Sequence, residues 1–464
     1  MAKKNTFTVT LDSTGEQKSA SVKIKPTLKK FMVHFRRPKD YQGKYGFDWL
    51  RDEYIYPIKS VAIETPPSSG KFISTKTTLC KNVASLKTEY KKDVLNPISP
   101  YGNDYYPAWL SIFPHTTSAQ FKHGSRMHKD GVNLDLEIEE LEPLLKDSTE
   151  LLFECSDKNV IITPNKLKLK DLIGTKKTKN LGGTNTRNYY LATKKINIKN
   201  TTAPLKNHKE IKIFAKLGTQ KEEVGKLMIY ENSRIPKAEV VVINVKYASS
   251  LANLRDDYQY LFKNQSFNQA LIRMDVTTDT KFNLDEIIRK HPTDPDVISL
   301  KNNFIAPSQV DASTKDIQFH NDIIKLYEKY GKHSPGIGMI DGNQQKTYLF
   351  YTNILASSSG FSTLGICSLN TTTGLWGNSY IIYSSGLSSK HTVTHEAGHS
   401  FSLEHSFQSG ATKHEFYQGT TDNIMDYSQQ DDATAGFYNE DKMNCFFKWQ
   451  WDIMRTDRSL INTY

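Results

Sequence analysis

Three closely spaced histidines constrain this chain more than any other feature. His395, Glu396 and His399 form the pattern H-E-x-x-H, and His405 follows six residues after His399. On a helix, residues four apart lie on one face, so the first two histidines can present their imidazoles to one point. A turn after Leu403 would bring His405 back to that point as a third nitrogen ligand. Three protein ligands and one open position are typical of a catalytic zinc site, with Glu396 placed to act as a general base.

The surrounding residues support a helix. Val393, Ala397 and Phe401 recur every four residues and form an apolar stripe, from which the histidines face away. The adjacent serines 388 and 389 are suitable N-caps. Gly398 costs a helix ~1 kcal/mol relative to alanine, so its presence predicts close packing against another element.

Residues 395–405, together with the segment 421–428, resemble the metzincin zinc proteases, whose mark is H-E-x-x-H-x-x-G-x-x-H followed by a methionine turn. The glycine position of that pattern holds Ser402, and a non-glycine residue in a left-handed turn costs roughly 1 kcal/mol. The resemblance implies that Met425 lies beneath the metal as a hydrophobic base. It also implies that Tyr427 lies at the zinc, where it can bind the metal or stabilise an oxyanion.

The order of elements after residue 236 fits the same resemblance. Strand-like and helix-like patterns alternate from Val240 to Tyr383, and an aromatic-rich helix is predicted from Phe437 to Arg455. We therefore expect an α+β fold: a metzincin-like zinc protease domain with a mixed twisted sheet and helices, preceded by β-rich, sandwich-like N-terminal structure. The resemblance implies that substrate adds as a strand along a sheet edge near Phe361 to Leu369.

Simpler interpretations exist for each residue. The H-E-x-x-H pattern could be the polar face of an ordinary helix, Met425 a core residue and Tyr427 a structural tyrosine. A gluzincin arrangement would use Glu415 or Glu440 as the third ligand. His391 and His414 lack ligand spacing, and we expect them on the surface or behind the ligands.

Composition indicates a globular protein of several domains. The chain has 464 residues, 37% hydrophobic and 24% charged, and no run of 18 apolar residues that would predict a membrane span. Its start turns polar before an apolar segment forms, so we expect cytoplasmic localisation or export without a conventional signal peptide. Four cysteines are widely spaced. Cys367 and Cys445 could pair, but we expect separate thiols.

Charge divides the chain near residue 240. Residues 1–240 carry a net charge of +16 and the remainder −5, for a total of +11. Together with the change of pattern, this predicts a β-rich region over 1–145, a β-sandwich-like domain over 146–235 and the protease domain over 236–464. The last segment is long enough for an independent core. The lysines are scattered, so we do not expect nucleic acid as a partner.

The segment from His34 to Arg51 is rich in aromatic and basic residues, including Arg36-Arg37-Pro38 and Phe47-Asp48-Trp49-Leu50-Arg51. About twenty residues here faintly resemble N-terminal segments of bacterial proteins associated with contractile (type VI) secretion systems. The resemblance implies a secretion-machinery partner for the basic half. The alternative, which we favour, is an aromatic-rich structural loop.

These observations favour a zinc endopeptidase that acts on protein or peptide substrates. Zn²⁺ would bind His395, His399 and His405, with Glu396 as the base and Tyr427 as the oxyanion donor. Such an enzyme could be a delivered bacterial effector or toxin. Two alternatives stay open: a non-catalytic β-rich binding or delivery protein with a degenerate protease fold, and a zinc amidase that acts on cell-wall peptides.

Overall fold

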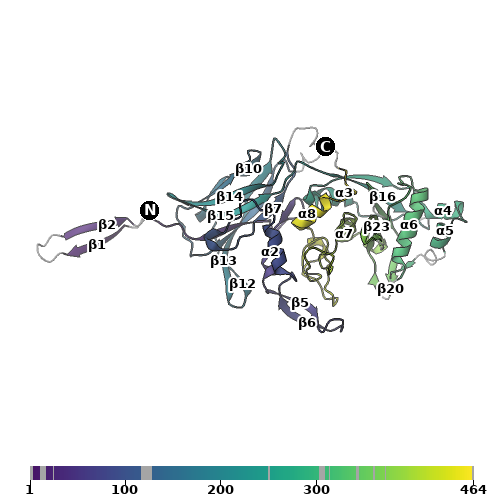
Figure 1. Cartoon of the computed structure of the whole chain (residues 1–464), viewed down its shortest axis with the longest axis horizontal. Helices are drawn as coiled ribbons and strands as arrows, with labels where there is room; N and C mark the ends of the chain where they lie inside the picture. The colour runs from purple at the N-terminus through teal and green to yellow at the C-terminus, as the bar shows by residue number, and fades with distance from the viewer. Residues whose placement is uncertain are drawn as a thin grey trace.

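The computed structural model describes residues 4–10, 17–23, 26–115, 128–248, 251–301, 309–312, 314–340, 344–358, 361–370 and 373–461 (Figure 1). At the N-terminus, β1 (Lys4–Thr10) and β2 (Gln17–Lys23) pair as an antiparallel hairpin. Within these described ranges, no helix is both long and apolar enough to cross a membrane.

Most of the N-terminal half forms two β-sheets. The first contains, in spatial order, β10 (Val160–Thr163), β13 (Asn185–Asn200), β8 (Val132–Glu140) and β3 (Phe31–Arg36), with β12 (Lys177–Gly182) also paired to β13. The second contains β11 (Lys166–Lys168), β9 (Glu150–Cys155), β14 (Lys209–Leu217), β15 (Gln220–Ile229), β7 (Ala108–Ser111) and β4 (Gly46–Asp48). Strands from both predicted segments, 1–145 and 146–235, therefore belong to the same two sheets.

One hydrophobic core fills the space between these sheets. Alternate residues of β14, Ile211, Ile213 and Ala215, are fully buried, because successive side chains of a strand point to opposite faces. Gly225 of β15 lies so close to β3 that an added Cβ would be 2.2 Å from the carbonyl oxygen of Val33. The two sheets thus pack face to face, as the short alternating strands predict for a sandwich.

An insertion between β4 and β7 extends from the sandwich. It contains α1 (Asp52–Ile55), the hairpin of β5 (Lys59–Glu64) and β6 (Phe72–Thr77), and α2 (Val83–Lys91). Asn82 caps α2, because its side-chain oxygen accepts from the N–H of Ser85 at 3.0 Å.

The C-terminal half is built on a five-stranded mixed sheet. Its order is β17 (Arg273–Asp279), β16 (Lys237–Val245), β19 (Thr347–Thr352), β23 (Leu375–Ile382) and β22 (Gly365–Asn370). The first four strands are parallel, and β22 is antiparallel at the edge. A smaller sheet contains β18 (Gln309–Asp311), β20 (Leu355–Ser358) and β21 (Phe361–Ser362).

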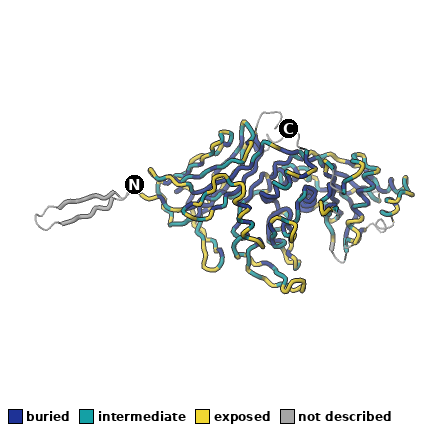
Figure 2. The backbone as a smooth tube through the Cα atoms, viewed as in Figure 1, coloured by how far each residue is buried: buried dark blue, intermediate teal, exposed yellow. Residues whose placement is uncertain are grey.

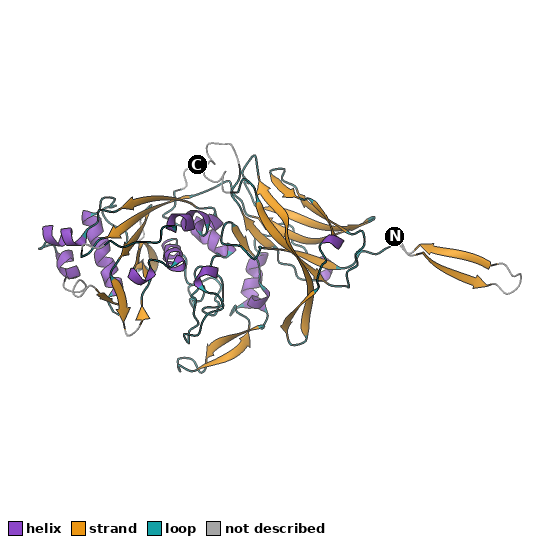
Figure 3. Ribbon diagram, turned by 180° about the vertical axis from the view of Figure 1, so that it is seen from behind, coloured by secondary structure: helices purple, strands orange, loops and turns teal. Residues whose placement is uncertain are grey.

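Helices cover both faces of the five-stranded sheet (Figure 3). Phe350 of β19 belongs to the core shared with α6 (Asp316–Tyr330), α4 (Leu284–Lys290) and α5 (Pro295–Leu300). Leu349, its neighbour, belongs to the core shared with α3 (Tyr258–Asn264), α7 (Lys390–Ser400) and α8 (Lys448–Arg455). The helix that carries the histidine motif thus lies against the sheet face that also holds α8.

The two halves share hydrophobic cores. Trp109 and Met228 of the sandwich pack in the same cluster as Trp451 and Met454 of α8. A second cluster joins the insertion to the C-terminal segment through Tyr54, Leu86, Tyr90, Phe416, Phe447 and Trp449. Figure 2 shows buried residues in both halves and in the region between them.

The C-terminal helix is shorter than predicted. It covers Lys448–Arg455, whereas the sequence pattern predicted a helix from Phe437. The preceding residues contain only a short 3-10 helix, η7 (Glu440–Lys442). On either side of it the N–H of Phe437 donates to the carbonyl oxygen of Gly419 at 2.7 Å, and Cys445 forms a bridge with Asn423. The backbone groups of this stretch are therefore bonded to other segments and are not free to form helical hydrogen bonds.

Candidate active site

Helix α7 presents the first two histidines. Its N-terminus is capped by Ser389, whose hydroxyl accepts from the N–H of Thr392 at 3.0 Å. The predicted stripe of Val393, Ala397 and Phe401 is fully buried. An added Cβ on Gly398 would lie 2.4 Å from the sulfur of Met425, so the glycine permits the close packing that its position predicted.

The chain turns sharply after α7 at Ser402, as the position of this residue in the motif predicted. Ser402 has a φ of 66°, in the left-handed region, and the N–H of Leu403 donates to the carbonyl oxygen of Gly398 at 3.1 Å. The Ser402 hydroxyl donates to Oδ2 of Asp457 at 2.5 Å. This hydrogen bond offsets the cost of a non-glycine residue in that conformation, and the turn sends His405 back towards α7.

Three imidazole nitrogens meet at one point. The Nε2 atoms of His395, His399 and His405 lie 3.1 to 3.2 Å from one another. Two nitrogens bound to one tetrahedral zinc at about 2.0–2.1 Å would lie roughly 3.3 Å apart, so the spacing fits one metal ion. Among the described residues, this triad is the one group of histidine, cysteine and acidic side chains placed to hold a metal.

The other ring nitrogens determine the tautomers. Nδ1 of His395 lies 2.8 Å from the carbonyl oxygen of Ile424, and Nδ1 of His399 lies 2.7 Å from that of Leu403. A carbonyl oxygen can only accept, so both Nδ1 atoms carry the proton. Nδ1 of His405 likewise meets the side-chain oxygen of Gln408 at 3.2 Å. Three unprotonated Nε2 lone pairs therefore face one another, an arrangement that a cation stabilises.

Burial keeps the triad neutral. Burial and the neighbouring imidazoles hold the pKa of His395 and that of His399 well below the usual value. Burial also lowers the pKa of His405. Neutral imidazole is the form that binds a metal ion.

Glu396 lies beside the triad against β22. Burial raises the pKa of its carboxyl to about 8, although the backbone N–H of Cys367 donates to it and favours the ionised form. An added Cβ on Gly365 would lie 2.8 Å from Cγ of Glu396, so the edge strand approaches this side chain closely. A carboxyl with a pKa near neutrality can both take up and return a proton.

The segment 421–427 forms the floor of the cluster. Met425 is fully buried beneath α7, and its N–H donates to the side chain of Asn423 at 2.8 Å. The hydroxyl of Tyr427 lies 3.1 Å from Nε2 of His405. Burial, with the nearby carboxylates of Glu396 and Asp426, raises the pKa of Tyr427 to about 12, so its hydroxyl stays a donor. All six residues that the sequence singled out are thus brought together.

Two aromatic neighbours were not predicted as part of the cluster, and His391 takes the place behind the ligands that was one of the two expected for it. The ring of Trp376 on β23 stacks on His399 at 4.1 Å, and that of Phe407 stacks on His405 at 4.9 Å. His391 is buried, and its Nε2 shares the carbonyl oxygen of Ile424 with His395. Phe407 follows His405 by two residues, whereas nothing in the sequence pattern marks Trp376.

The alternative ligands lie elsewhere. Glu415 pairs with Lys81, and Glu440 accepts from the hydroxyl of Ser389 at 2.8 Å. His414 lies by Ser85 and Glu89 in the insertion. The thiols of Cys367 and Cys445 are both free and buried, as expected from their separate positions.

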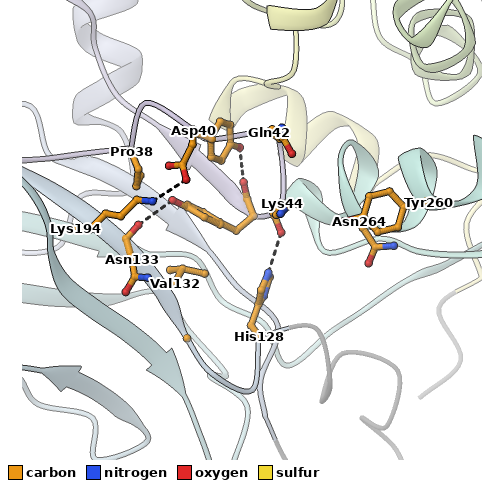
Figure 4. Close-up of a pocket in the computed structure, with 13 residues that line it drawn as sticks. Pro38, Asp40, Gln42, Lys44, His128, Val132, Asn133, Lys194, Tyr260 and Asn264 are labelled. Carbon is orange, nitrogen blue, oxygen red and sulfur yellow. Dashed lines mark hydrogen bonds and ion pairs between the residues drawn. The ribbon is translucent and has the colours of Figure 1, made fainter. Parts of the chain in front are cut away.

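A cavity of about 360 Å³ lies at the junction of the two halves, lined by other residues (Figure 4). His128 accepts from the N–H of Phe113 at 2.8 Å and donates to the carbonyl oxygen of Lys44 at 2.9 Å. Lys194 pairs with Asp40 at 2.7 Å. His128 and Lys194 thus already have polar partners, and the residues that line the cavity do not include the histidine cluster.

Comparison with known families points to the histidine cluster. Residues 355–453 match the family model Peptidase_M43, described as Pregnancy-associated plasma protein-A. The match begins at β20 and ends within α8, so it includes the triad, Glu396 and the segment 421–427. It supports a metallopeptidase that acts on peptide or protein substrates. No curated protein sequence is significantly similar to the chain.

Proposed function

We propose that the chain is a zinc-dependent endopeptidase with a metzincin-like catalytic half. The observation that carries the proposal is the convergence of three unprotonated Nε2 atoms, 3.1 to 3.2 Å apart, beside a buried carboxyl. An all-imidazole donor set suits zinc. His395, His399 and His405 would hold the ion. Zinc with an open position polarises a scissile carbonyl and activates water.

The protein's own groups would move the protons. Glu396, ionised, accepts a proton from the attacking water on a carboxylate oxygen and then donates it to the nitrogen of the leaving amine. The hydroxyl of Tyr427 donates a hydrogen bond to the oxygen that becomes negative in the tetrahedral transition state. Trp376 and Phe407 flank the triad and limit the access of bulk water to it.

The edge strand β22 provides a place for substrate. It pairs with β23 on one side, within the part of the sheet that is described, and approaches Glu396 at Gly365. An extended peptide can add to such an edge through main-chain hydrogen bonds. The scissile bond would then lie beside the carboxyl that handles the protons.

The intact arrangement favours an enzyme over a degenerate binding protein. A protein that had lost catalysis would have no need of a carboxyl group at the triad. Glu396 is nevertheless buried there and accepts a hydrogen bond from the N–H of Cys367. Ser402, the departure from the metzincin pattern, adopts the left-handed conformation that its position requires.

The test measures zinc content and proteolysis together. Purified protein should carry about one zinc per chain. Glu396→Gln should retain zinc and fold but cleave casein at least ~10²-fold more slowly, because the base is lost. Glu415→Gln, a carboxylate in an ion pair with Lys81, serves as the matched control and should cleave at the wild-type rate.

Two outcomes would reject the proposal. Stoichiometric zinc in a His395→Ala/His399→Ala double variant would place the metal elsewhere. Cleavage of casein by Glu396→Gln at the wild-type rate would show that Glu396 is not the general base. Cleavage of cell-wall peptides with no cleavage of casein would instead support the amidase alternative.

A further inference from the structure

An ion-pair cluster joins the N-terminal half to the floor of the candidate active site. Arg37 and Arg51 each direct a guanidinium Nη2 to the carboxylate of Asp422, one to each oxygen; the Arg51 distance is 2.8 Å. Asp422 is 1% exposed and Arg51 4%. The two arginines belong to the N-terminal half and Asp422 to the C-terminal half, and they meet in the interior between the two halves.

Trp49 keeps the two guanidinium groups in place. Cζ of Arg51 lies 4.2 Å, and Cζ of Arg37 5.1 Å, from the centre of a Trp49 ring. Burial alone would favour the neutral acid, but both arginines counteract it and bring the pKa of Asp422 to about 2. The carboxylate is therefore ionised and held in one orientation.

The rest of this N-terminal segment, residues 37–51, is also seated against the C-terminal half. The carboxylate of Asp48 accepts from the N–H of Lys448, the first residue of α8, at 2.8 Å. An added Cβ on Gly43 would lie 2.4 Å from the carbonyl oxygen of Gln265. With such close backbone contact, the segment cannot shift without moving the residues around it.

Asp422 begins the turn that supports the histidine cluster. Two residues later, the carbonyl oxygen of Ile424 accepts from Nδ1 of His395 at 2.8 Å and from Nε2 of His391 at 2.9 Å. Tyr427, at the end of the same turn, reaches His405. Hydrogen bonds to the outer nitrogen of a ligating imidazole orient the ring, and their loss typically weakens metal binding 10–100-fold.

We propose that Arg37 and Arg51 are positioning residues for the metal site, which hold the turn 422–427 in place through Asp422. The N-terminal half then completes the catalytic centre, because its segment 37–51 holds the floor of the site in position. The inference rests on the proposed zinc site. It replaces the expectation that residues 236–464 act as an independent unit.

The test substitutes the arginines conservatively in the full-length protein. Arg51→Lys and Arg37→Lys keep the charge but lose the planar fork that reaches the carboxylate. Arg36→Lys is the matched control: Arg36 is the adjacent arginine, pairs with Glu137 at 2.7 Å and belongs to β3 of the sandwich. Near-UV circular dichroism selects folded variants. If Arg51→Lys does not fold, Arg37→Lys, at a side chain 17% exposed, carries the comparison.

Two readouts separate positioning from general stability. Zinc affinity, measured by competition with a chelator, should fall about 10-fold or more in the Arg37 and Arg51 variants and stay unchanged in the control. The visible absorption of the cobalt-substituted protein should shift, because the geometry of its imidazole ligands changes. For casein cleavage we expect kcat to fall about 10-fold or more with little change in KM.

The outcomes distinguish the two proposals. If folded lysine variants keep wild-type zinc affinity and the wild-type cobalt spectrum and lose only thermal stability, the arginines are merely structural and this inference is overturned. If wild-type protein itself binds no zinc, the proposed function fails, and this inference falls with it.

Discussion

Replacement of Ser402 offers a direct measure of how this chain tolerates its departure from the metzincin pattern. Ser402→Gly removes the left-handed strain, a gain of roughly 1 kcal/mol. It also removes the hydroxyl that donates to the Asp457 carboxylate at 2.5 Å. A hydrogen bond to a charged group contributes ~1.5–3 kcal/mol. The net expectation is that Ser402→Gly destabilises the protein by about 0.5–2 kcal/mol.

Ser402→Ala separates the two effects. Alanine loses the same hydrogen bond but keeps the strained φ of 66°, so it should destabilise by the full ~1.5–3 kcal/mol. The difference between the alanine and glycine variants then reports the backbone strain, about 1 kcal/mol. Unfolding in urea, followed by circular dichroism with chelator present, gives these free energies without a contribution from bound metal. If Ser402→Gly is more stable than wild type, the hydrogen bond to Asp457 contributes less than the backbone strain costs, and the prediction is wrong. If the glycine and alanine variants are equally stable, the backbone at residue 402 is not strained.

Three further predictions concern the floor of the site. Tyr427→Phe should lower kcat by ~10-fold or more with KM little changed, because the hydroxyl acts on the transition state; unchanged steady-state kinetics would make it a packing residue. Gly398→Ala should destabilise the protein by ~1–3 kcal/mol in urea unfolding, because the added Cβ would meet the sulfur of Met425 at 2.4 Å. Alanine is the better helix former, so a stabilised variant would contradict this packing. The pKa of Asp422 is depressed from 3.8 to about 2 in the folded protein. The ionised carboxylate therefore stabilises the folded state above pH 3.8, and this contribution is lost as the pH falls towards 2. Nearly two pKa units correspond to about 2–3 kcal/mol, and urea midpoints between pH 5 and pH 2 should fall less steeply in Asp422→Asn than in wild type.

Local patterns in the sequence predicted the local parts of the site well. The spacing of His395 and His399 and the stripe on α7 follow from helix geometry alone, and the alternating residues of β14 follow from strand geometry. His405 depended on a turn at a non-glycine residue. The turn that places His405 is supported by the hydrogen bond from Ser402 to Asp457. Asp457 lies more than fifty residues further along the chain, and no local pattern identifies it as a partner.

Long-range contacts account for what the sequence pattern did not predict. Arg37 lies 385 residues before Asp422, so their pairing follows from the packing of two halves and from no spacing along the chain. Trp376 reaches His399 because β23 lies beside α7 in space. The C-terminal helix starts later than predicted for a related reason, since hydrogen bonds and a bridge to the segment 419–423 hold the backbone before Lys448.

The hydrogen bond from the N–H of Lys448 to Asp48 also constrains the order in which the parts of the molecule can assemble. It joins groups 400 residues apart, and the cluster that contains Trp449 likewise needs residues 54–90. Contacts of such sequence separation form late, because a long loop must close before they contribute. During synthesis, the strands of the sandwich are made long before α8. The assembled centre therefore forms only after α8 has been made.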